Sequence, residues 1–167
     1  MKKIASTLLI IVLAACHEKP VVLPQGGLGE HAPASSKERA ADLYRLERQQ
    51  IQQWISLQGE KFYPTAAGYW SSEPLSTHPI KSDGDPVSYE FSVSDFDQAP
   101  IYSQPIVVTD GKLGSYAEIM AVDHAIRHLE SHKTVTLLVP SALAYGTAGD
   151  EKKIGPDLPL IIHLNTR

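Results

Sequence analysis

The sequence predicts an α+β domain in which an antiparallel sheet is wrapped around one helix. Three segments alternate apolar and polar side chains with the period of two that half-buried strands show: Val87 to Val93, Val135 to Val139 and Leu160 to Leu164. Between the first and second of these segments, the apolar period lengthens to that of a helix, from about Tyr116 to His132. Several strands around one crossing helix are typical of an α+β fold.

Length and composition indicate one domain with appended segments. The chain has 167 residues, enough for a single hydrophobic core, and shows no internal repeat. Its 15 basic and 19 acidic side chains give a net charge of −4, which argues against a phosphate-binding surface. We therefore expect no nucleic acid among its partners, and the composition leaves the oligomeric state open.

Residues 1–15 have the features of a lipoprotein signal peptide. Lys2 and Lys3 precede an apolar run from Ile4 to Leu13, which at about ten residues is too short to span a bilayer. The run leads through two alanines into Cys16, the only cysteine of the chain. This pattern resembles the lipobox of bacterial lipoproteins, in which the cysteine receives acyl chains such as palmitate and becomes the new N-terminus. The alternative is an ordinary secretory signal with a cysteine near its cleavage site by coincidence.

Lipidation of Cys16 would anchor the chain to a membrane of the cell envelope, because several acyl chains on one residue hold a bilayer firmly. His17 follows in place of the Asp that favours inner-membrane retention in some bacteria, so we expect an outer-membrane anchor facing the periplasm. Residues 16–36 combine the lipidated cysteine with a stretch rich in Pro and Gly, which predicts a flexible tether. A single cysteine also excludes a disulfide within the chain.

An amphipathic helix is predicted from Lys37 to Gln58, within an N-terminal segment of residues 37–60. Ser35 or Ser36 can cap its start, and Gly59 can end it. The predicted apolar face consists of Leu43, Leu46, Ile51, Trp54 and Leu57. The predicted polar side consists of Arg45, Arg48, Gln49 and Gln52. Such a helix packs either on its own domain, which is the commoner case, or on a partner.

Residues 61–167 contain the predicted sheet and its central helix. Besides the three alternating segments, short strands are expected at Gly68-Tyr69-Trp70, Ile101-Tyr102-Ser103 and Ile106-Val107-Val108. The sequence Asp83-Gly84-Asp85-Pro86 has the composition of a turn and leads into the strand at Val87.

Three histidines are spaced four residues apart on the predicted central helix: His124, His128 and His132. This spacing puts them on one stripe, which could hold a metal ion. The apolar side chains of the helix fall on the opposite face, at Ile119, Val122, Ile126 and Leu129. We therefore expect the histidine stripe to face water and to bind no metal.

The most specific segment is VTLLVPSALAYG, from Val135 to Gly146. It resembles the strand and loop of FKBP-type peptidyl-prolyl isomerases, whose common pattern is close to V-P-x-x-x-A-Y-G. The likeness continues through Gly149, Ile154-Gly155-Pro156 and the final strand, and it covers residues 83–166, about half of the chain. Motifs of serine hydrolases, nucleotide-binding loops and zinc proteases are absent from the sequence.

The resemblance implies an FKBP-like antiparallel sheet wrapped around one helix, an N-terminal helical extension, and peptidyl-prolyl cis-trans isomerase activity. By position, it implies a proline pocket lined by Tyr89, Ile101, Ile106, Ile119, Val122, Ile154 and Ile162. Tyr145 would be the catalytic residue, with its hydroxyl donating to the substrate carbonyl, and Gly146 would let the loop turn away. Isomerisation breaks no covalent bond, so we expect no cofactor.

The sequence departs from the family pattern at several pocket positions. Ile101-Tyr102-Ser103 lacks the Asp that usually follows the aromatic residue, and Val122 stands where a large aromatic, often Trp, is usual. Ile106 and Ile162 also stand where aromatic walls are usual. Each replacement of an aromatic residue, at Val122, Ile106 and Ile162, removes ring surface. We therefore expect a shallower or wider pocket that binds proline rings more weakly.

The lipobox, the N-terminal helix, Gly68-Tyr69-Trp70 and the loop from Gly146 to Pro156 together resemble FKBP-type lipoproteins associated with gliding motility in Bacteroidetes. The first hypothesis is therefore an envelope-anchored isomerase that assists the folding of exported, proline-containing client proteins. A second hypothesis is a catalytically weak chaperone or binding module of an envelope machine on the same fold. A third is a structural lipoprotein whose likeness ends at the fold.

Overall fold

A computed structural model describes residues 35–115 and 119–167 of the chain. The predicted signal peptide, the lipidation site Cys16 and the tether up to residue 34 lie outside the described residues, as does Tyr116 at the expected start of the central helix. Residues Ser35–Arg167 form one compact unit, which includes the N-terminal helix as well as the sheet.

Helix α1 spans Ser36–Gln58, and Ser35 caps its start, one of the two predicted positions, in a capping box with Glu38. The Ser35 hydroxyl accepts a hydrogen bond from the backbone N–H of Glu38 at 3.2 Å, and the Glu38 carboxylate accepts one from the N–H of Ser35 at 2.7 Å. Gly59 ends the helix in the left-handed conformation, with a φ of 72°. Within the described residues, no helix is both long enough and apolar enough to cross a membrane.

The face that α1 buries matches the predicted apolar face only in part, at the buried Ile51 and the half-buried Trp54. Glu47 and Ile51 are its buried residues, whereas Leu46 and Leu57 are 50% and 76% exposed. Arg48, which was expected on the solvent side, lies with its guanidinium over an aromatic ring of the domain. Apolar periodicity missed the rest of the buried face, because that part contains Glu47 and Arg48, each with a polar partner in the domain.

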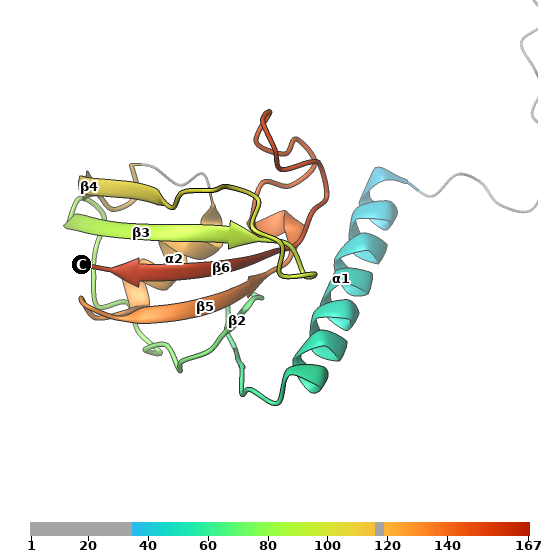
Figure 1. Cartoon of the computed structure of the whole chain (residues 1–167), viewed down its shortest axis with the longest axis horizontal. Coiled ribbons are helices and arrows are strands. Elements are labelled where there is room, and N and C mark those ends of the chain that lie inside the picture. Colours follow the sequence, from blue (N-terminus) through green and yellow to red (C-terminus); the bar gives the residue numbers. More distant parts are fainter. Residues whose placement is uncertain (1–34, 116–118) are drawn as a thin grey trace, which may run out of the picture. The chain divides into compact units, whose positions relative to one another are not determined.

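The sheet has six antiparallel strands in the order β1-β2-β5-β6-β3-β4 (Figure 1). Their bounds are β1 Tyr63–Pro64, β2 Trp70–Ser71, β3 Pro86–Ser94, β4 Ile106–Lys112, β5 Thr134–Val139 and β6 Leu160–Thr166. The three segments with the clearest alternation became β3, β5 and β6, which lie next to one another at the centre. Helix α2, Met120–His128, lies against one face of this sheet. The predicted α+β fold, a sheet wrapped around one helix, is confirmed.

The two faces of the sheet carry separate hydrophobic clusters. In β5, Leu137 packs in the cluster that contains α2, and its neighbour Leu138 packs in the cluster beneath α1. In β6, Ile162 and Ile161 divide in the same way. Successive side chains of a strand point to opposite faces, so strands covered on both sides must be apolar at consecutive positions. This explains the continuous run Leu160 to Ile162 at the start of β6.

Three local features differ from the expectation. Ile101-Tyr102-Ser103 forms bends rather than a strand, because the N–H of Ile101 turns back to a β3 carbonyl at 3.0 Å. The central helix ends at His128 rather than at His132, since Leu129 is extended and His132 has a φ of 62°. Strand β1, Tyr63–Pro64, was not expected, because two residues are too few to show a period.

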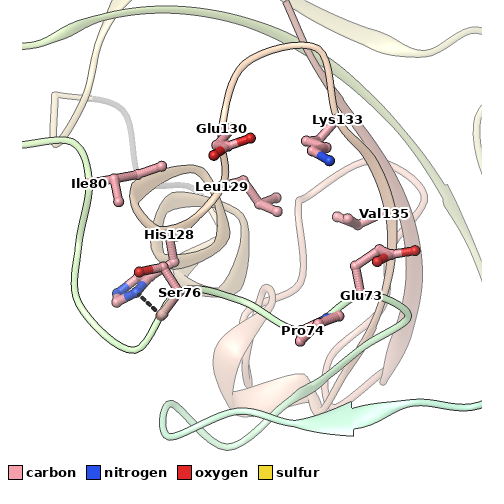
Figure 2. A pocket seen from close by; sticks show the side chains of 9 residues that line it. All are labelled: Glu73, Pro74, Ser76, Ile80, His128, Leu129, Glu130, Lys133 and Val135. Carbon is pink, nitrogen blue, oxygen red and sulfur yellow. Dashed lines mark hydrogen bonds between the residues drawn. The ribbon is translucent and has the colours of Figure 1, made fainter.

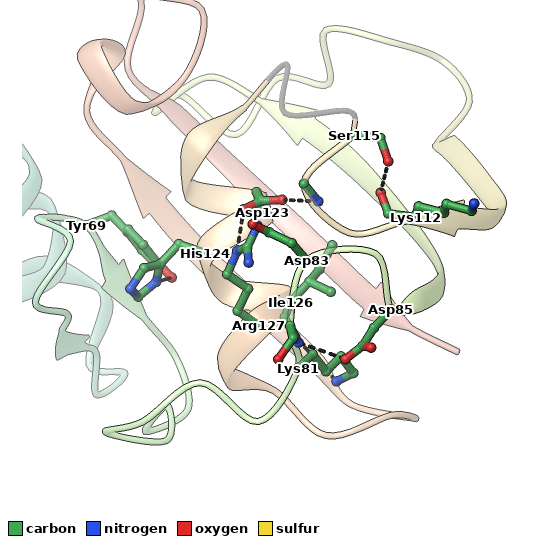
Figure 3. A network of polar contacts seen from close by, with 12 residues as sticks. Tyr69, Lys81, Asp83, Asp85, Lys112, Ser115, Asp123, His124, Ile126 and Arg127 are labelled. Carbon is green, nitrogen blue, oxygen red and sulfur yellow. Dashed lines mark hydrogen bonds and ion pairs between the residues drawn. The ribbon is translucent and has the colours of Figure 1, made fainter.

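A polar cluster fixes the segment before β3 onto α2 (Figure 3). The Arg127 guanidinium pairs with Asp123 at 2.7 Å, one turn earlier on α2, and with Asp83 at 2.6 Å. The Asp123 carboxylate also accepts a hydrogen bond from the N–H of Gly114 at 3.3 Å. These contacts hold the turn at Asp83 and the turn after β4 against the same helix, the first through Arg127 and the second through Asp123.

Candidate functional site

A small apolar recess lies between α2, β3 and β4. Its walls are Tyr89, Phe91, Ile106, Val108, Ile119, Val122 and Asp123. Its volume is about 20 Å³, enough for about one water molecule. Strand alternation explains the walls, because Tyr89 and Phe91 share one face of β3 and Ile106 and Val108 share the same face of β4.

A wider, open pocket of about 460 Å³ adjoins this recess. It is lined by Tyr102, Ile106, Ala144, Tyr145, Gly149, Asp150, Glu151 and Lys152. Ile106 lines both hollows, so the two are neighbours on one surface. Tyr145 therefore lines the pocket that adjoins the apolar recess at Ile106.

The position of Tyr145 follows from the way β5 ends. Pro140 closes the strand, and a short 3₁₀ helix, η1 Ser141–Leu143, leads into the loop. Gly146 adopts a φ of 58°, which lets its N–H return to the Ser141 carbonyl at 2.9 Å. The chain thus reverses directly after Tyr145 and leaves this side chain at the pocket.

Helix α1 holds the start of this loop. The buried Glu47 carboxylate accepts two hydrogen bonds from Ser141, one from the backbone N–H at 2.8 Å and one from the hydroxyl at 2.6 Å. A charged acceptor makes both bonds stronger than neutral ones. The N-terminal helix is therefore attached to the residue that begins the turn carrying Tyr145.

Asp150 organises the far side of the loop. One carboxylate oxygen accepts hydrogen bonds from the backbone N–H groups of Lys152, Lys153 and Ile154, at 3.0, 2.9 and 2.8 Å. The other oxygen accepts a hydrogen bond from the Tyr102 hydroxyl. Burial opposes ionisation, but these hydrogen bonds outweigh it and lower the pKa of Asp150 to about 2.

Asp150 is the site residue that sequence reasoning missed. The segment Ile101-Tyr102-Ser103 carries no carboxylate, but the loop after Tyr145 supplies one to the Tyr102 hydroxyl. The available signal was Gly149-Asp150 within a charged turn, since Asp commonly bonds to backbone N–H groups a few residues later. That signal predicts the turn, but it does not predict the tyrosine 48 residues earlier in the chain.

Comparison with solved structures places this geometry in a known fold. The crystal structure of FkpA from Escherichia coli matches with a TM-score of 0.56 and 16% identity, over 78% of this chain and 60% of FkpA. A peptidyl-prolyl cis-trans isomerase from Pseudomonas syringae pv. tomato matches with a TM-score of 0.56 and 21% identity, over 83% of this chain and 96% of that protein. The fold is FKBP-like.

The likeness is structural. No protein-family profile matches the chain, and no curated protein matches its sequence. At identities below 25%, the FKBP-like structures establish the fold, and the arrangement of side chains has to carry any argument about function.

The FKBP-like fold brings most of the predicted site residues together. Four of them, Tyr89, Ile106, Ile119 and Val122, surround the recess, and Tyr145 lines the adjoining pocket. The three others lie elsewhere: Ile101 packs half-buried against the main core, while Ile154 and Ile162 are 3% and 0% exposed within it. Ile154 and Ile162 line neither hollow and support the site from within the core.

The predicted water-facing stripe is found only in part, since His132 is exposed whereas His124 and His128 are half-buried. The Tyr69 hydroxyl and His124 Nδ1 are 2.9 Å apart, and His128 donates from Nδ1 to the Ser76 carbonyl at 2.7 Å. The rings of His124 and His128 stack with centroids 4.3 Å apart, while His132 lies beyond the end of the helix. Across residues 35–115 and 119–167, no group of three or more His, Cys, Asp or Glu side chains is arranged to hold a metal ion.

A separate hollow of about 380 Å³ lies near the end of α2 (Figure 2). Glu73, Glu130, Lys133 and His128 line it together with apolar residues, so charges of both signs face the same space. It contains none of the predicted pocket residues and no tyrosine. We therefore place the candidate site at Tyr145 and the apolar recess.

Proposed function

We propose that the protein is a peptidyl-prolyl cis-trans isomerase. The observation that carries this proposal is the convergence of Tyr145 and an apolar recess on an FKBP-like fold, with Ile106 shared between the two hollows. Rotation about an X-Pro bond faces a barrier of about 18–20 kcal/mol and needs neither a nucleophile nor a metal ion. A site composed of apolar walls and one hydroxyl donor is sufficient for this reaction.

The catalytic effect arises from desolvation and one hydrogen bond. Apolar surroundings disfavour the charge-separated resonance form of the imide, which eases rotation about its C–N bond. The Tyr145 hydroxyl donates to a carbonyl next to the proline and holds the peptide while the bond rotates. Because the recess holds only about 20 Å³, its walls must open to admit the ring. We therefore expect slow catalysis.

NMR exchange spectroscopy on short Leu-Pro peptides tests the isomerase. The full-length protein in mild detergent should accelerate cis-trans exchange, and Tyr145→Phe should reduce the acceleration about tenfold or more. Tyr63→Phe is the matched control, since Tyr63 lies on β1 outside both hollows, and it should behave as the wild type. A folded wild-type protein without any acceleration would refute the enzyme, and an unaffected Tyr145→Phe would refute the role of the hydroxyl.

A second candidate is a chaperone or binding module with weak or no catalysis. The small volume of the recess favours this candidate, since a five-membered ring does not fit beside these side chains without movement. Such a module would bind proline-containing client segments without speeding their exchange. The test has two measurements. The binding module is supported over the enzyme if the protein suppresses the aggregation of an unfolded, proline-containing protein and if cis-trans exchange of the Leu-Pro peptides is no faster than in buffer alone.

We further propose that the domain acts at the cell envelope through a lipid on Cys16, facing the periplasm from the outer membrane. The basic start, the apolar run and the lone cysteine support this proposal. Labelling of cells with radioactive palmitate should mark the wild type and spare Cys16→Ser, which should move from the membrane fraction to the soluble one. Equal labelling of both proteins would overturn it.

The proposed clients are exported proteins, and a link to gliding motility rests on the resemblance to gliding-associated lipoproteins. A deletion strain should lose colony spreading if this link holds. Complementation with Tyr145→Phe then separates an enzymatic role in motility from a structural one.

A further inference from the structure

A groove of about 600 Å³ runs along β4 and continues the candidate site. It shares Tyr89, Ile106, Val108 and Asp123 with the apolar recess, and it shares Ile106 and Lys152 with the pocket at Tyr145. Beyond these residues, the groove extends along the strand to Leu113 and Gly114. A ligand seated at Tyr145 can therefore continue along β4 without leaving the surface of the hollow.

The strand beside this groove is the last one of the sheet. β4 pairs with β3, and no other described strand pairs with it. Because backbone groups alternate in direction along a strand, every second residue of such an edge strand directs its N–H and C=O away from the sheet. An extended polypeptide can pair with these groups, a mode of recognition that many peptide-binding domains use.

The charged residues that line the groove differ in whether they have an ion-pair partner. Lys112, Asp123 and Lys152 are its charged lining residues. The Asp123 carboxylate is paired with Arg127 at 2.7 Å, whereas the Lys112 side chain extends away from this cluster (Figure 3). Neither Lys112 nor Lys152 has a hydrogen bond, ion pair or ring contact from its ammonium group to any part of the chain that the structure describes. The groove thus presents the ammonium groups of Lys112 and Lys152 beside an apolar floor, while Asp150 and Glu151 line the adjoining pocket at Tyr145.

We propose that this groove binds the extended segment of the substrate that flanks the proline, and that Lys112 and Lys152 select segments carrying Asp or Glu. The inference rests on the proposed function, because it assumes that the proline occupies the site at Tyr145. It adds to that function a substrate class, acidic extended polypeptide, and two specificity-determining residues. The protein has a net charge of −4, so this local preference is opposite in sign to its overall charge.

Binding of matched peptides to the full-length protein tests this proposal. The peptides contain one Leu-Pro pair and differ only in having Glu or Gln two and four residues to either side. One exposed ion pair changes affinity up to about fivefold, so the wild type should bind the best Glu peptide about threefold to fivefold more tightly than its Gln counterpart. The difference should shrink with added salt.

The variants separate the groove from general charge effects. Lys112→Gln/Lys152→Gln should bind Glu and Gln peptides equally. The control Lys37→Gln/Lys133→Gln removes the same charge outside the groove and should keep the wild-type preference. Equal binding of both peptides by the wild type, or no binding of either, overturns the groove proposal, and so does a preference that survives Lys112→Gln/Lys152→Gln.

Exchange spectroscopy on the Gln peptide distinguishes this failure from failure of the proposed function. Accelerated exchange without a Glu preference refutes the groove and leaves the isomerase. The opposite result is a Glu preference that the double variant abolishes, with no acceleration of exchange. It would support the groove and refute the isomerase, and the binding module would remain.

Discussion

Single side chains connect parts of the FKBP-like domain that are far apart in sequence. Ser141 begins the turn to Tyr145, and its partner Glu47 belongs to the N-terminal helix. Asp150, five residues after Tyr145, reaches the hydroxyl of Tyr102. Both carboxylates receive several donors at once, so the loop that carries the candidate catalytic tyrosine is held at its start and near its end.

Removal of the Glu47 carboxylate should destabilise the protein. Glu47→Ala leaves two buried donors of Ser141 without a partner, and we expect a loss of about 1–3 kcal/mol in the free energy of unfolding, measured by urea denaturation. Gln50→Ala, at an exposed position of the same helix, should change it by less than about 0.5 kcal/mol. Equal effects of the two substitutions would show that the Ser141 contacts contribute nothing.

The carboxylate of Asp150 should make stability depend on acid pH. Its pKa is about 2 in the folded protein against 3.8 in the reference state, so the stabilisation is present above pH 3.8 and is lost as pH falls towards 2. The difference in unfolding free energy between wild type and Asp150→Asn should therefore shrink across this window. A difference that stays constant from pH 5 to pH 2 would contradict the assigned hydrogen bonds.

At the scale of elements, α2 is attached to the chain before β3 through its polar face. Tyr69 contacts His124, and Ser76 contacts His128, so the two histidines link the helix to the segments on either side of β2. Burial is the main cause that lowers the pKa of His124, and the neighbouring His128 lowers it further. Protonation of His124 is thus disfavoured in the folded state.

This contact predicts a loss of stability below neutral pH. The unfolded chain binds a proton at His124 near pH 6.5, above the lowered folded pKa, so stability falls as pH decreases through 6.5 towards that lower value. In thermal melts between pH 8 and pH 5, His124→Gln should reduce this dependence. His78→Gln, at an exposed position, should leave it unchanged. The same slope in wild type and His124→Gln would contradict the prediction.

For the whole molecule, the main core between α2 and the sheet supplies the stability on which the site depends. Ile126 on α2 is 2% exposed within this core, whereas Met120 on the same helix is 53% exposed. Ile126→Ala should cost about 2–5 kcal/mol of unfolding free energy, because it removes apolar contacts and leaves a cavity. Met120→Ala should cost less than about 0.5 kcal/mol. Similar midpoints in urea for the two variants would contradict this assignment of the core.

Local sequence signals were sufficient to predict most of the helices and strands. The alternation in β3, β5 and β6, the cap at Ser35 and the stop at Gly59 depend on residues within a few positions of one another, so the sequence alone determined them. The pattern around Tyr145 likewise predicted the turn at Gly146. Two-sided burial in β5 and β6 differs from the half-buried strands that their alternation predicts, because apolar residues also occupy the intervening positions.

Only the tertiary structure decided which distant residues meet. The pairs Glu47–Ser141 and Tyr102–Asp150 join positions 94 and 48 residues apart, and no local period reports such a contact. The same holds for the buried face of α1, where Arg48 faces the domain although apolar counting placed it towards solvent. The sequence by itself determined the strands, helices and turns because their causes are local. The recess, its small volume and its anchoring loop depend on how those elements pack, which local residues do not specify.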